Sequence, residues 1–207
     1  MQPDFSKIRN IIFDLGGVVM DLHEQATVKA FAELFNKSED EIQAFSKESF
    51  FQEYETGKID DPTFRAKIRE EFEFTGDEEA MDAAWNAMLG PIAKSKIEVF
   101  DRLSKDHSIY VLSNTNDIHF RMIEKIFEHS SGGRSFYKIF NEVYLSQEIG
   151  HRKPELEIYQ HVLNDAGITA SESLFIDDKE ENIIAAQKAG MQGYVFPKND
   201  SFDKLFG

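Results

Sequence analysis

Residues 10–21, with the sequence Asn-Ile-Ile-Phe-Asp-Leu-Gly-Gly-Val-Val-Met-Asp, decide the fold. The segment begins with an unbroken apolar run, which is typical of a strand buried on both faces of a parallel sheet. Asp14 follows this run directly, and the two glycines after it allow the backbone to turn tightly. Because ligands bind beyond the carboxyl ends of the strands in an open parallel sheet, we predict that Asp14 lies at a ligand-binding edge.

Four further short apolar runs have the same character and are separated by helical patterns. An alternation of strand and helix predicts a doubly wound, Rossmann-like α/β fold with a parallel sheet. The expected strands span residues 10–14, 109–113, 142–145, 174–178 and 193–196, and the expected helices span about 94–106, 117–128, 155–166 and 180–189.

Residues 21–91 interrupt this alternation, because they show helical patterns and no strand signal. Ser38 and Glu41 have the spacing of a capping box, Pro62 marks a helix start, and another helix is expected over residues 77–89. A segment of about 70 residues is too long for a crossover loop. We therefore expect a small helical cap (21–91) inserted into a core made of residues 1–20 and 92–207.

The composition excludes several classes of protein. The 207 residues include 23 Lys and Arg against 38 Asp and Glu, a net charge of −15, which argues against binding to nucleic acid or to anionic membranes. The chain has no cysteine, so a disulfide scaffold, a thiolate zinc site and a cysteine nucleophile are excluded. The apolar runs are far too short to span a bilayer. We expect a cytoplasmic monomer whose partner is a small molecule.

Polar side chains follow the other expected strands at the same edge of the sheet. Ser113 and Asn114 follow the second strand, Lys153 lies in the segment after the third, and Asp177 and Asp178 follow the fourth. A carboxylate can attack phosphorus and form an acyl-phosphate, and the repulsion between the two anions then requires cations. Carboxylates and a backbone carbonyl are suited to hold Mg²⁺, and a lysine supplies further positive charge. The pattern therefore favours phosphoryl chemistry.

The order of Asp14, Ser113, Lys153 and Asp177-Asp178, with a helical insert after the first, resembles the haloacid dehalogenase (HAD) superfamily with an inserted C1-type cap. This resemblance covers nearly the whole chain. A branch that contains bacterial α-D-glucose-1-phosphate phosphatases is the most similar. The segments that carry it are FDLGGVVMD (13–21), LSQEIGHRKPELEIYQHVL (145–163) and FIDDKEENIIAAQKAGM (175–191).

The resemblance implies a Mg²⁺-dependent phosphatase that acts on a small phosphorylated metabolite. It also implies a role for each residue of the motifs. Asp14 would be the nucleophile and a metal ligand, Lys153 would neutralise charge, Ser113 and Asn114 would bind phosphate or substrate, and Asp178, Asp177 and the Gly16 carbonyl would complete the metal site.

Gly16 departs from the pattern of the superfamily, which usually has a second Asp two residues after the nucleophile as general acid and base. The main-chain carbonyl can still contact the metal, but the proton donor is lost. A positioned acid or base contributes roughly 10²–10⁴-fold. The loss matters least for a leaving oxygen that is a stable anion, as in a sugar 1-phosphate. This fits the branch that the motifs resemble, and the resemblance implies α-D-glucose 1-phosphate as the substrate. His23 and Glu24 are candidates for the missing group, although solvated side chains are the simpler interpretation.

Three alternatives follow from the same residues. A 2-haloacid dehalogenase also lacks the second Asp, but it has little use for the pair Asp177-Asp178, because its reaction needs no metal. A catalytically silent phosphosugar-binding protein would explain Gly16 but not the other intact positions. A phosphomutase would particularly need the missing acid and base.

Overall fold

The computed structural model describes residues 3–198 and 202–206. Its centre is a five-stranded sheet with the order β3-β2-β1-β4-β5, in which every neighbouring pair is parallel. The predicted Rossmann-like fold is therefore confirmed. The strands are β1 (Asn10–Phe13), β2 (Ser108–Ser113), β3 (Glu142–Leu145), β4 (Ser173–Asp177) and β5 (Gln192–Val195).

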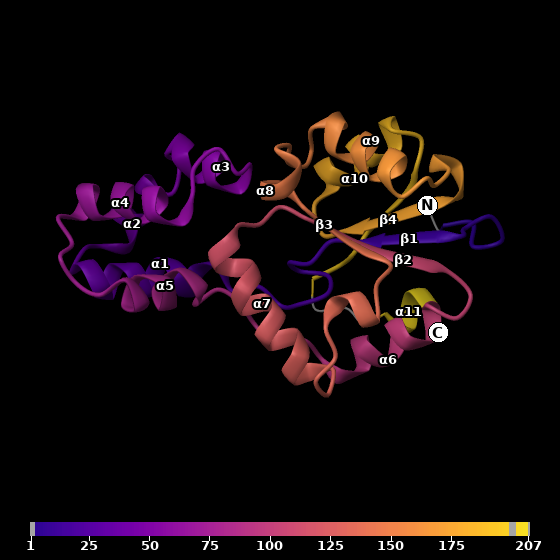
Figure 1. Cartoon of the computed structure of the whole chain (residues 1–207), viewed down its shortest axis with the longest axis horizontal. Coiled ribbons are helices and arrows are strands. Elements are labelled where there is room, and N and C mark those ends of the chain that lie inside the picture. The colour runs from indigo at the N-terminus through magenta and orange to yellow at the C-terminus, as the bar shows by residue number, and fades with distance from the viewer. Residues whose placement is uncertain (1–2, 199–201, 207) are drawn as a thin grey trace.

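Helices cover both faces of the sheet (Figure 1). The unbroken apolar character of the strands has a direct reason, since alternate side chains enter two separate hydrophobic cores. Ile11 and Phe13 of β1 belong to one core, and Ile12 belongs to the other. The first core includes α6 (Lys94–Leu103), α7 (Asp117–Ser130) and α11 (Asp203–Phe206), and the second includes α9 (Leu156–Asp165) and α10 (Glu180–Lys188).

The strand bounds agree with the sequence prediction to within one residue, and the main differences lie in short elements. β4 ends at Asp177, so that Asp178 already belongs to the loop. Four short segments were not predicted, because one helical turn has no apolar period to detect. They are α8 (Ser146–Ile149), η1 (Phe136–Lys138), η2 (Ala170–Glu172) and α11 (Asp203–Phe206).

Five helices lie between β1 and α6 and form a layer beyond the carboxyl ends of the strands (Figure 1). We call this layer the cap. The expected capping box is present, since the Ser38 side chain accepts from Glu41 N–H and Glu41 reaches back to Ser38. Pro62 is the second residue of its helix, after Asp61. The helices are α1 (Glu24–Phe35), α2 (Glu39–Phe45), α3 (Ser49–Glu55), α4 (Asp61–Phe72) and α5 (Glu78–Asn86).

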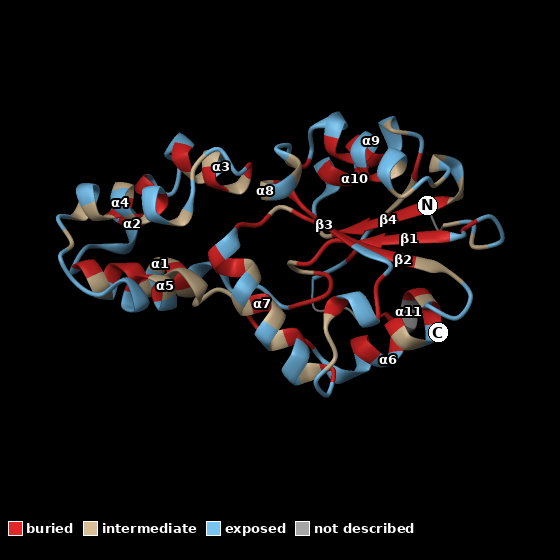
Figure 2. Ribbon diagram, viewed as in Figure 1, coloured by how far each residue is buried: buried red, intermediate tan, exposed pale blue. Residues whose placement is uncertain are grey.

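The cap has its own hydrophobic core, which is rich in aromatic side chains. The cap helices carry buried segments of their own, apart from those of the sheet (Figure 2). Phe35 and Phe72 stack with ring centroids 4.5 Å apart, and Tyr54 and Phe64 stack at 4.1 Å. Stacked and edge-on aromatic pairs add stability beyond the area they bury. The abundance of phenylalanine therefore has a packing role in the cap. None of the helices within the described ranges is both long enough and apolar enough to cross a membrane.

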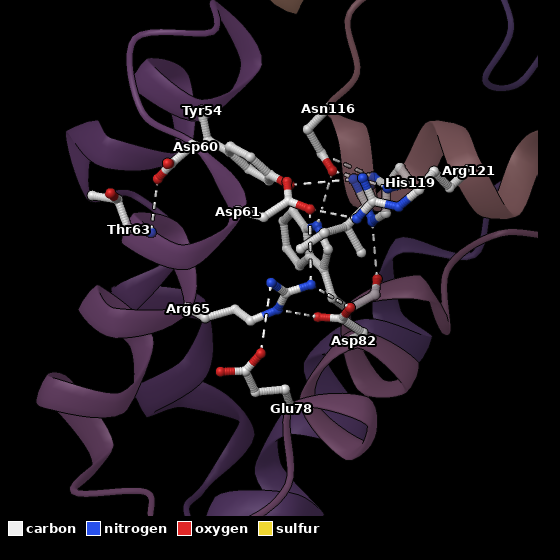
Figure 3. A network of polar contacts seen from close by, with 12 residues as sticks. Tyr54, Asp60, Asp61, Thr63, Arg65, Glu78, Asp82, Asn116, His119 and Arg121 are labelled. Atoms are coloured by element: carbon white, nitrogen blue, oxygen red, sulfur yellow. Dashed lines mark hydrogen bonds and ion pairs between the residues drawn. The ribbon is translucent and has the colours of Figure 1, made fainter.

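The N-terminal end of α7 joins the core to the cap through a polar network (Figure 3). Tyr54 of α3 donates to Asp61 at 2.5 Å and accepts from the backbone N–H of Ile118 at 3.2 Å. Arg121 of α7 forms an ion pair with the same Asp61. Ile118 itself belongs to the hydrophobic core of the cap. These contacts fix the position of the cap relative to one end of the sheet.

His119 completes this interface from within. Its Nε2–H donates to the Trp85 carbonyl at 3.1 Å, and its Nδ1 accepts from the Asn116 amide at 3.2 Å, so the neutral ring has both nitrogens satisfied. The Trp85 ring stacks on it with centroids 4.6 Å apart. Burial lowers the pKa of His119 to about 4. A proton on this ring would leave a buried charge facing a donor.

We expect His119 to make the fold acid-sensitive. The folded protein binds the proton less tightly than the unfolded chain, whose histidine pKa is about 6.5, so stability is lost as the pH falls from 6.5 toward 4. Between pH 7 and pH 4.5 the native protein should lose about 2 kcal/mol more unfolding free energy than His119→Gln, which cannot titrate. Urea titrations at both pH values measure this difference, and equal losses in the two proteins would contradict it.

Candidate active site

A cavity of about 530 Å³ lies at the carboxyl edge of the sheet, on the side that faces the cap. We call it the catalytic cavity. Its position is where parallel α/β sheets bind ligands. The residues that matter for its chemistry are Asp14, Gly17, Leu22, Asn114, Lys153 and Asp178.

Asp14 is the first residue after β1 and is 8% exposed. Its backbone N–H donates to the Ile176 carbonyl at 2.9 Å, which ties it to the neighbouring strand β4. Its side-chain Oδ1 accepts from Leu15 N–H at 2.7 Å. Among the described residues, Oδ2 accepts no hydrogen bond in the structure. The carboxylate is therefore held in one orientation with one oxygen available to a ligand.

Lys153 lies between two of the predicted carboxylates and is 2% exposed. Its Nζ is 2.7 Å from Asp14 Oδ1 and 2.8 Å from Asp177 Oδ2, and it donates to the Leu112 carbonyl at 3.0 Å. The three donors of the ammonium group are thus all used. The backbone of Lys153 is fixed by Asn114, whose amide accepts from Lys153 N–H at 2.8 Å and donates to its carbonyl at 2.9 Å.

Asp177 is fully buried at the end of β4. Besides Lys153, it accepts from the Asn182 amide at 2.9 and 3.0 Å and from Lys179 N–H at 2.8 Å. Asn182 was not singled out in the sequence. Its position one turn into α10, five residues after Asp177, is the signal that would have identified it.

Asp178 is half-buried and lies against the turn formed by the two glycines after Asp14. Gly17 has a φ of +76°, and a Cβ at this position would lie 2.6 Å from Asp178 Oδ2. The backbone conformation and the close approach both require glycine here. The FDLGG turn is therefore shaped to make room for the Asp178 carboxylate.

The charges of the cluster do not balance. Oxygens of Asp14, Asp177 and Asp178 lie within 4.8 Å of one another, and Lys153 is the cation in direct contact with two of them. Burial, together with the neighbouring carboxylates, raises the pKa of Asp14. Burial and the charge on Asp177 raise the pKa of Asp178. Burial opposes the charge on Lys153, but the two carboxylates outweigh it and raise the pKa of the ammonium group.

These residues fit a hard divalent cation. Carboxylate oxygens are the ligands that Mg²⁺ prefers, and a dication would offset the excess negative charge of the three acids. Asp14 and Asp178 line the cavity, whereas Asp177 is held by hydrogen bonds beneath it. Asp14 and Asp178 are thus the direct ligands that we infer, with Asp177 acting through the neighbouring groups.

Ser113 and Asn114 lie nearby, but the structure places them differently from each other. Ser113 is 3% exposed, and its hydroxyl lies 3.4 Å from the Asn114 carbonyl. Asn114 lines the cavity, yet its amide is occupied with the backbone of Lys153. Phosphate binding by these two residues stays a prediction. The sequence did not predict that the Asn114 side chain fixes the backbone of Lys153, because the residue type alone does not show which way an amide points.

Gly16 lines the cavity, and the space beside it is filled by Leu22. A Cβ on Gly16 would lie 2.4 Å from Leu22 Cδ1. Leu22 lies on the segment that enters the cap, where it forms an antiparallel bridge with Leu89. A side chain at position 16 would therefore require Leu22 to move. His23 and Glu24 also line the cavity, next to Leu22.

Comparisons with known proteins show the family to which the chain belongs. A family profile described as haloacid dehalogenase-like hydrolase matches residues 8–190. A D-ribitol-5-phosphate phosphatase of Bacteroides thetaiotaomicron is 31% identical over 196 residues, which are 93% of each chain. A sesquiterpene phosphatase of Aspergillus oryzae is 26% identical, over 88% of this chain and 86% of the relative.

A solved structure gives the same result for the fold. The crystal structure of a HAD family enzyme from Bacteroides thetaiotaomicron, in complex with magnesium and inorganic phosphate, has a TM-score of 0.89 at 34% identity, covering 97% of this chain and 100% of that one. The chain therefore belongs to the haloacid dehalogenase-like hydrolase family. The resemblance found in the motifs is confirmed.

We expect Gly17→Ala to weaken Mg²⁺ binding, because the new methyl group would displace the Asp178 carboxylate. Gly132→Ala is the matched control, since Gly132 has a similar φ of +73° and its Cβ would meet no atom within 4 Å. Both changes strain the backbone and should lower stability by about 1 kcal/mol. Calorimetric Mg²⁺ titrations should show tenfold or more weaker binding for Gly17→Ala only. Equal affinities would rule out this role for the glycine turn.

Proposed function

We propose that the chain is a Mg²⁺-dependent phosphatase that hydrolyses a sugar or polyol phosphate through an aspartyl-phosphate on Asp14. Two of the relatives named above are a D-ribitol-5-phosphate phosphatase and a sesquiterpene phosphatase, and the solved HAD family enzyme is in complex with magnesium and inorganic phosphate, which supports a phosphoric monoester hydrolase that acts on a small phosphorylated metabolite. The observation that carries the proposal is the position of the buried Lys153 between Asp14 and Asp177. Asp14, Lys153 and Asp178 all line the same cavity.

Asp14 is the nucleophile in this proposal. Leu15 N–H and Lys153 contact Oδ1 and so orient the carboxylate for attack on phosphorus. The bond between phosphorus and the ester oxygen breaks, and the leaving alkoxide takes a proton from a water molecule, since Gly16 supplies no acid. Water then attacks phosphorus, the bond to Asp14 breaks, and inorganic phosphate leaves with the carboxylate restored.

Mg²⁺ supplies positive charge to the transferring phosphoryl group and would be held by Asp14, Asp178 and the Gly16 carbonyl. Lys153 keeps its proton next to two carboxylates and so stays a permanent cation beside the nucleophile. Asn182 and Lys179 N–H orient Asp177, and Asp177 in turn orients Lys153. These hydrogen bonds therefore fix the positions of the charged groups around Asp14 before a substrate binds.

The cap, residues 21–91 in our division of the chain, covers the opening of the catalytic cavity in this proposal. Leu22, His23 and Glu24 bring its entry segment to the cavity wall. A cover of this kind excludes bulk water while the ester bond breaks. The organic part of the substrate would contact these three residues and Gln25.

The leaving group is the point at which Gly16 matters. With Leu22 in the space beside Gly16, the leaving oxygen has no carboxylic acid at this position. The hemiacetal oxygen of a sugar 1-phosphate is more acidic than a primary alcohol and needs this proton less. We therefore propose α-D-glucose 1-phosphate as the specific substrate to test first, with D-ribitol 5-phosphate beside it because of the relative's activity.

Phosphate release should require both Mg²⁺ and Asp14. We expect Asp14→Asn to lose activity by at least 10³-fold, because an amide is a poor nucleophile and a neutral ligand. Asp101→Asn, which alters a surface ion pair with Arg134, should keep full activity. Phosphate release from sugar and polyol phosphates, with Mg²⁺ and with EDTA, measures this. Activity that survives EDTA or Asp14→Asn would refute the proposal.

The rate should also depend on the acidity of the leaving oxygen. We expect kcat/KM for α-D-glucose 1-phosphate to be about 10-fold or more higher than for D-glucose 6-phosphate, because Gly16 provides no acid to protonate the leaving oxygen. The difference should shrink in Gly16→Asp combined with Leu22→Ala, which makes space for an acid. Faster cleavage of the 6-phosphate by the native protein would contradict the argument.

A further inference from the structure

A second cavity of about 370 Å³ lies within the cap, and we call it the cap cavity. We propose that the cap cavity binds a flat heteroaromatic group at the far end of a sugar or polyol phosphate whose phosphoryl group reaches Asp14. This inference rests on the proposed phosphatase function and names the substrate class of that site. α-D-glucose 1-phosphate would then be a truncated substrate that fills the catalytic cavity alone.

The two cavities adjoin each other at the start of α1. Glu24 and Gln25 line both of them. From these residues, α1 leads into the cap, where α5 packs beside it (Figure 1). A molecule with its phosphate beside Asp14 therefore has a path past the side chains of Glu24 and Gln25 into the cap cavity.

Glu55 gives a second connection between the cap cavity and the catalytic residues. It lines the cap cavity from the end of α3 and forms an ion pair with Arg152, with Nη2 2.9 Å from Oε2. Arg152 immediately precedes Lys153 in the chain. The cap cavity is thus held against the loop that carries the buried lysine.

The walls of the cap cavity are mostly apolar and aromatic. Val28, Phe51, Trp85 and Met88 line it and are only half-buried. Half-exposed aromatic side chains around a common hollow are typical of a ligand pocket, and the volume is in the usual range of roughly 300–1,000 Å³. A polyol alone has no apolar surface to match these walls.

Trp85 is held in place before any ligand binds. Its ring stacks on His119 at 4.6 Å and lies 5.6 Å from the Phe51 ring, and its indole N–H points to Asn116 Oδ1 at 3.4 Å. A rigid aromatic wall loses little entropy when a flat ring packs against it. Preorganisation of this kind favours a planar ligand over a flexible chain.

Polar groups at the margin of the cap cavity indicate a ring with hydrogen-bonding atoms. Gln43, on the exposed side of α2, contributes an amide, and Glu55 contributes a carboxylate. Few polar groups around an apolar pocket fix the orientation of a ligand. The Gln43 amide can donate to a ring nitrogen or carbonyl, and Glu55 Oε1 can accept from a ring N–H or amino group, whereas a plain hydrocarbon would pair with neither.

Matched pairs of substrates test the proposal. Flavin mononucleotide is D-ribitol 5-phosphate that carries a flat ring system, and adenosine 5′-monophosphate is likewise D-ribose 5-phosphate with a ring. The leaving oxygen is a primary alcohol within each pair, so the ring is the variable. We expect kcat/KM to be roughly tenfold or more higher for the ring-bearing member of at least one pair.

Val28→Phe should fill the cap cavity and lower kcat/KM for the ring-bearing member of the pair to about that of the ring-free member. Lys29→Phe adds the same side chain to the exposed side of α1 and should keep the preference. Gln43→Trp, at an exposed position of α2, is a second filling variant that does not disturb the core of the cap. Hydrolysis of the ring-free phosphate reports that each variant is folded.

No preference in either pair, or a preference that both filling variants retain, would overturn the proposal. A higher kcat/KM for an acyclic isoprenoid phosphate than for both ring-bearing substrates, lost in Val28→Phe, would overturn the heteroaromatic assignment. If none of these esters is cleaved, the phosphatase function itself fails. Quenching of riboflavin fluorescence on addition of the protein, lost in Val28→Phe, would still support the ring site, and the absence of quenching would overturn it.

Discussion

The ammonium group of Lys153, buried between Asp14 and Asp177, is the interaction on which the site depends. Removal of one partner from such a buried group leaves an unpaired charge and is destabilising by about 3–5 kcal/mol. The lysine joins elements that are far apart in sequence, because Asp14 follows β1, Asp177 ends β4, and the Leu112 carbonyl belongs to β2. The sheet order places β1 between β2 and β4, so these strand ends meet at Lys153.

The lysine does not neutralise the cluster, and this imbalance explains how the site is built. Asp178 adds a third carboxylate within reach of the other two, and the left-handed Gly17 gives it room. Lys179 and Lys198 also line the cavity but, within the described part of the chain, make no ion pair with the three carboxylates, and a dication held by those carboxylates would add the positive charge that a phosphate anion needs there. The cap contributes no such cation in our proposal and selects the organic part of the substrate.

The sheet and the order of the site residues were predictable, because unbroken apolar runs and the acids after them are local in sequence. For example, the strand predicted at 10–14 is observed at Asn10–Phe13, and the strand predicted at 142–145 is observed at Glu142–Leu145. Contacts between distant segments were not predictable. Leu22 filling the space beside Gly16 and Glu55 of the cap pairing with Arg152 depend on how the insert packs. α8 was missed since a four-residue helix has no periodicity.

The central claim is that the carboxylates of Asp14, Asp177 and Asp178, together with Lys153, form a binding site for a divalent cation. Thermal unfolding of the native protein and of Asp178→Asn, each with and without Mg²⁺, tests it most directly. Without Mg²⁺, Asp178→Asn should unfold at a higher temperature than the native protein, because a repulsive charge is removed. Mg²⁺ should raise the unfolding temperature of the native protein by several degrees and that of the variant by much less. An unfolding temperature of the native protein that does not change with Mg²⁺ would contradict the account.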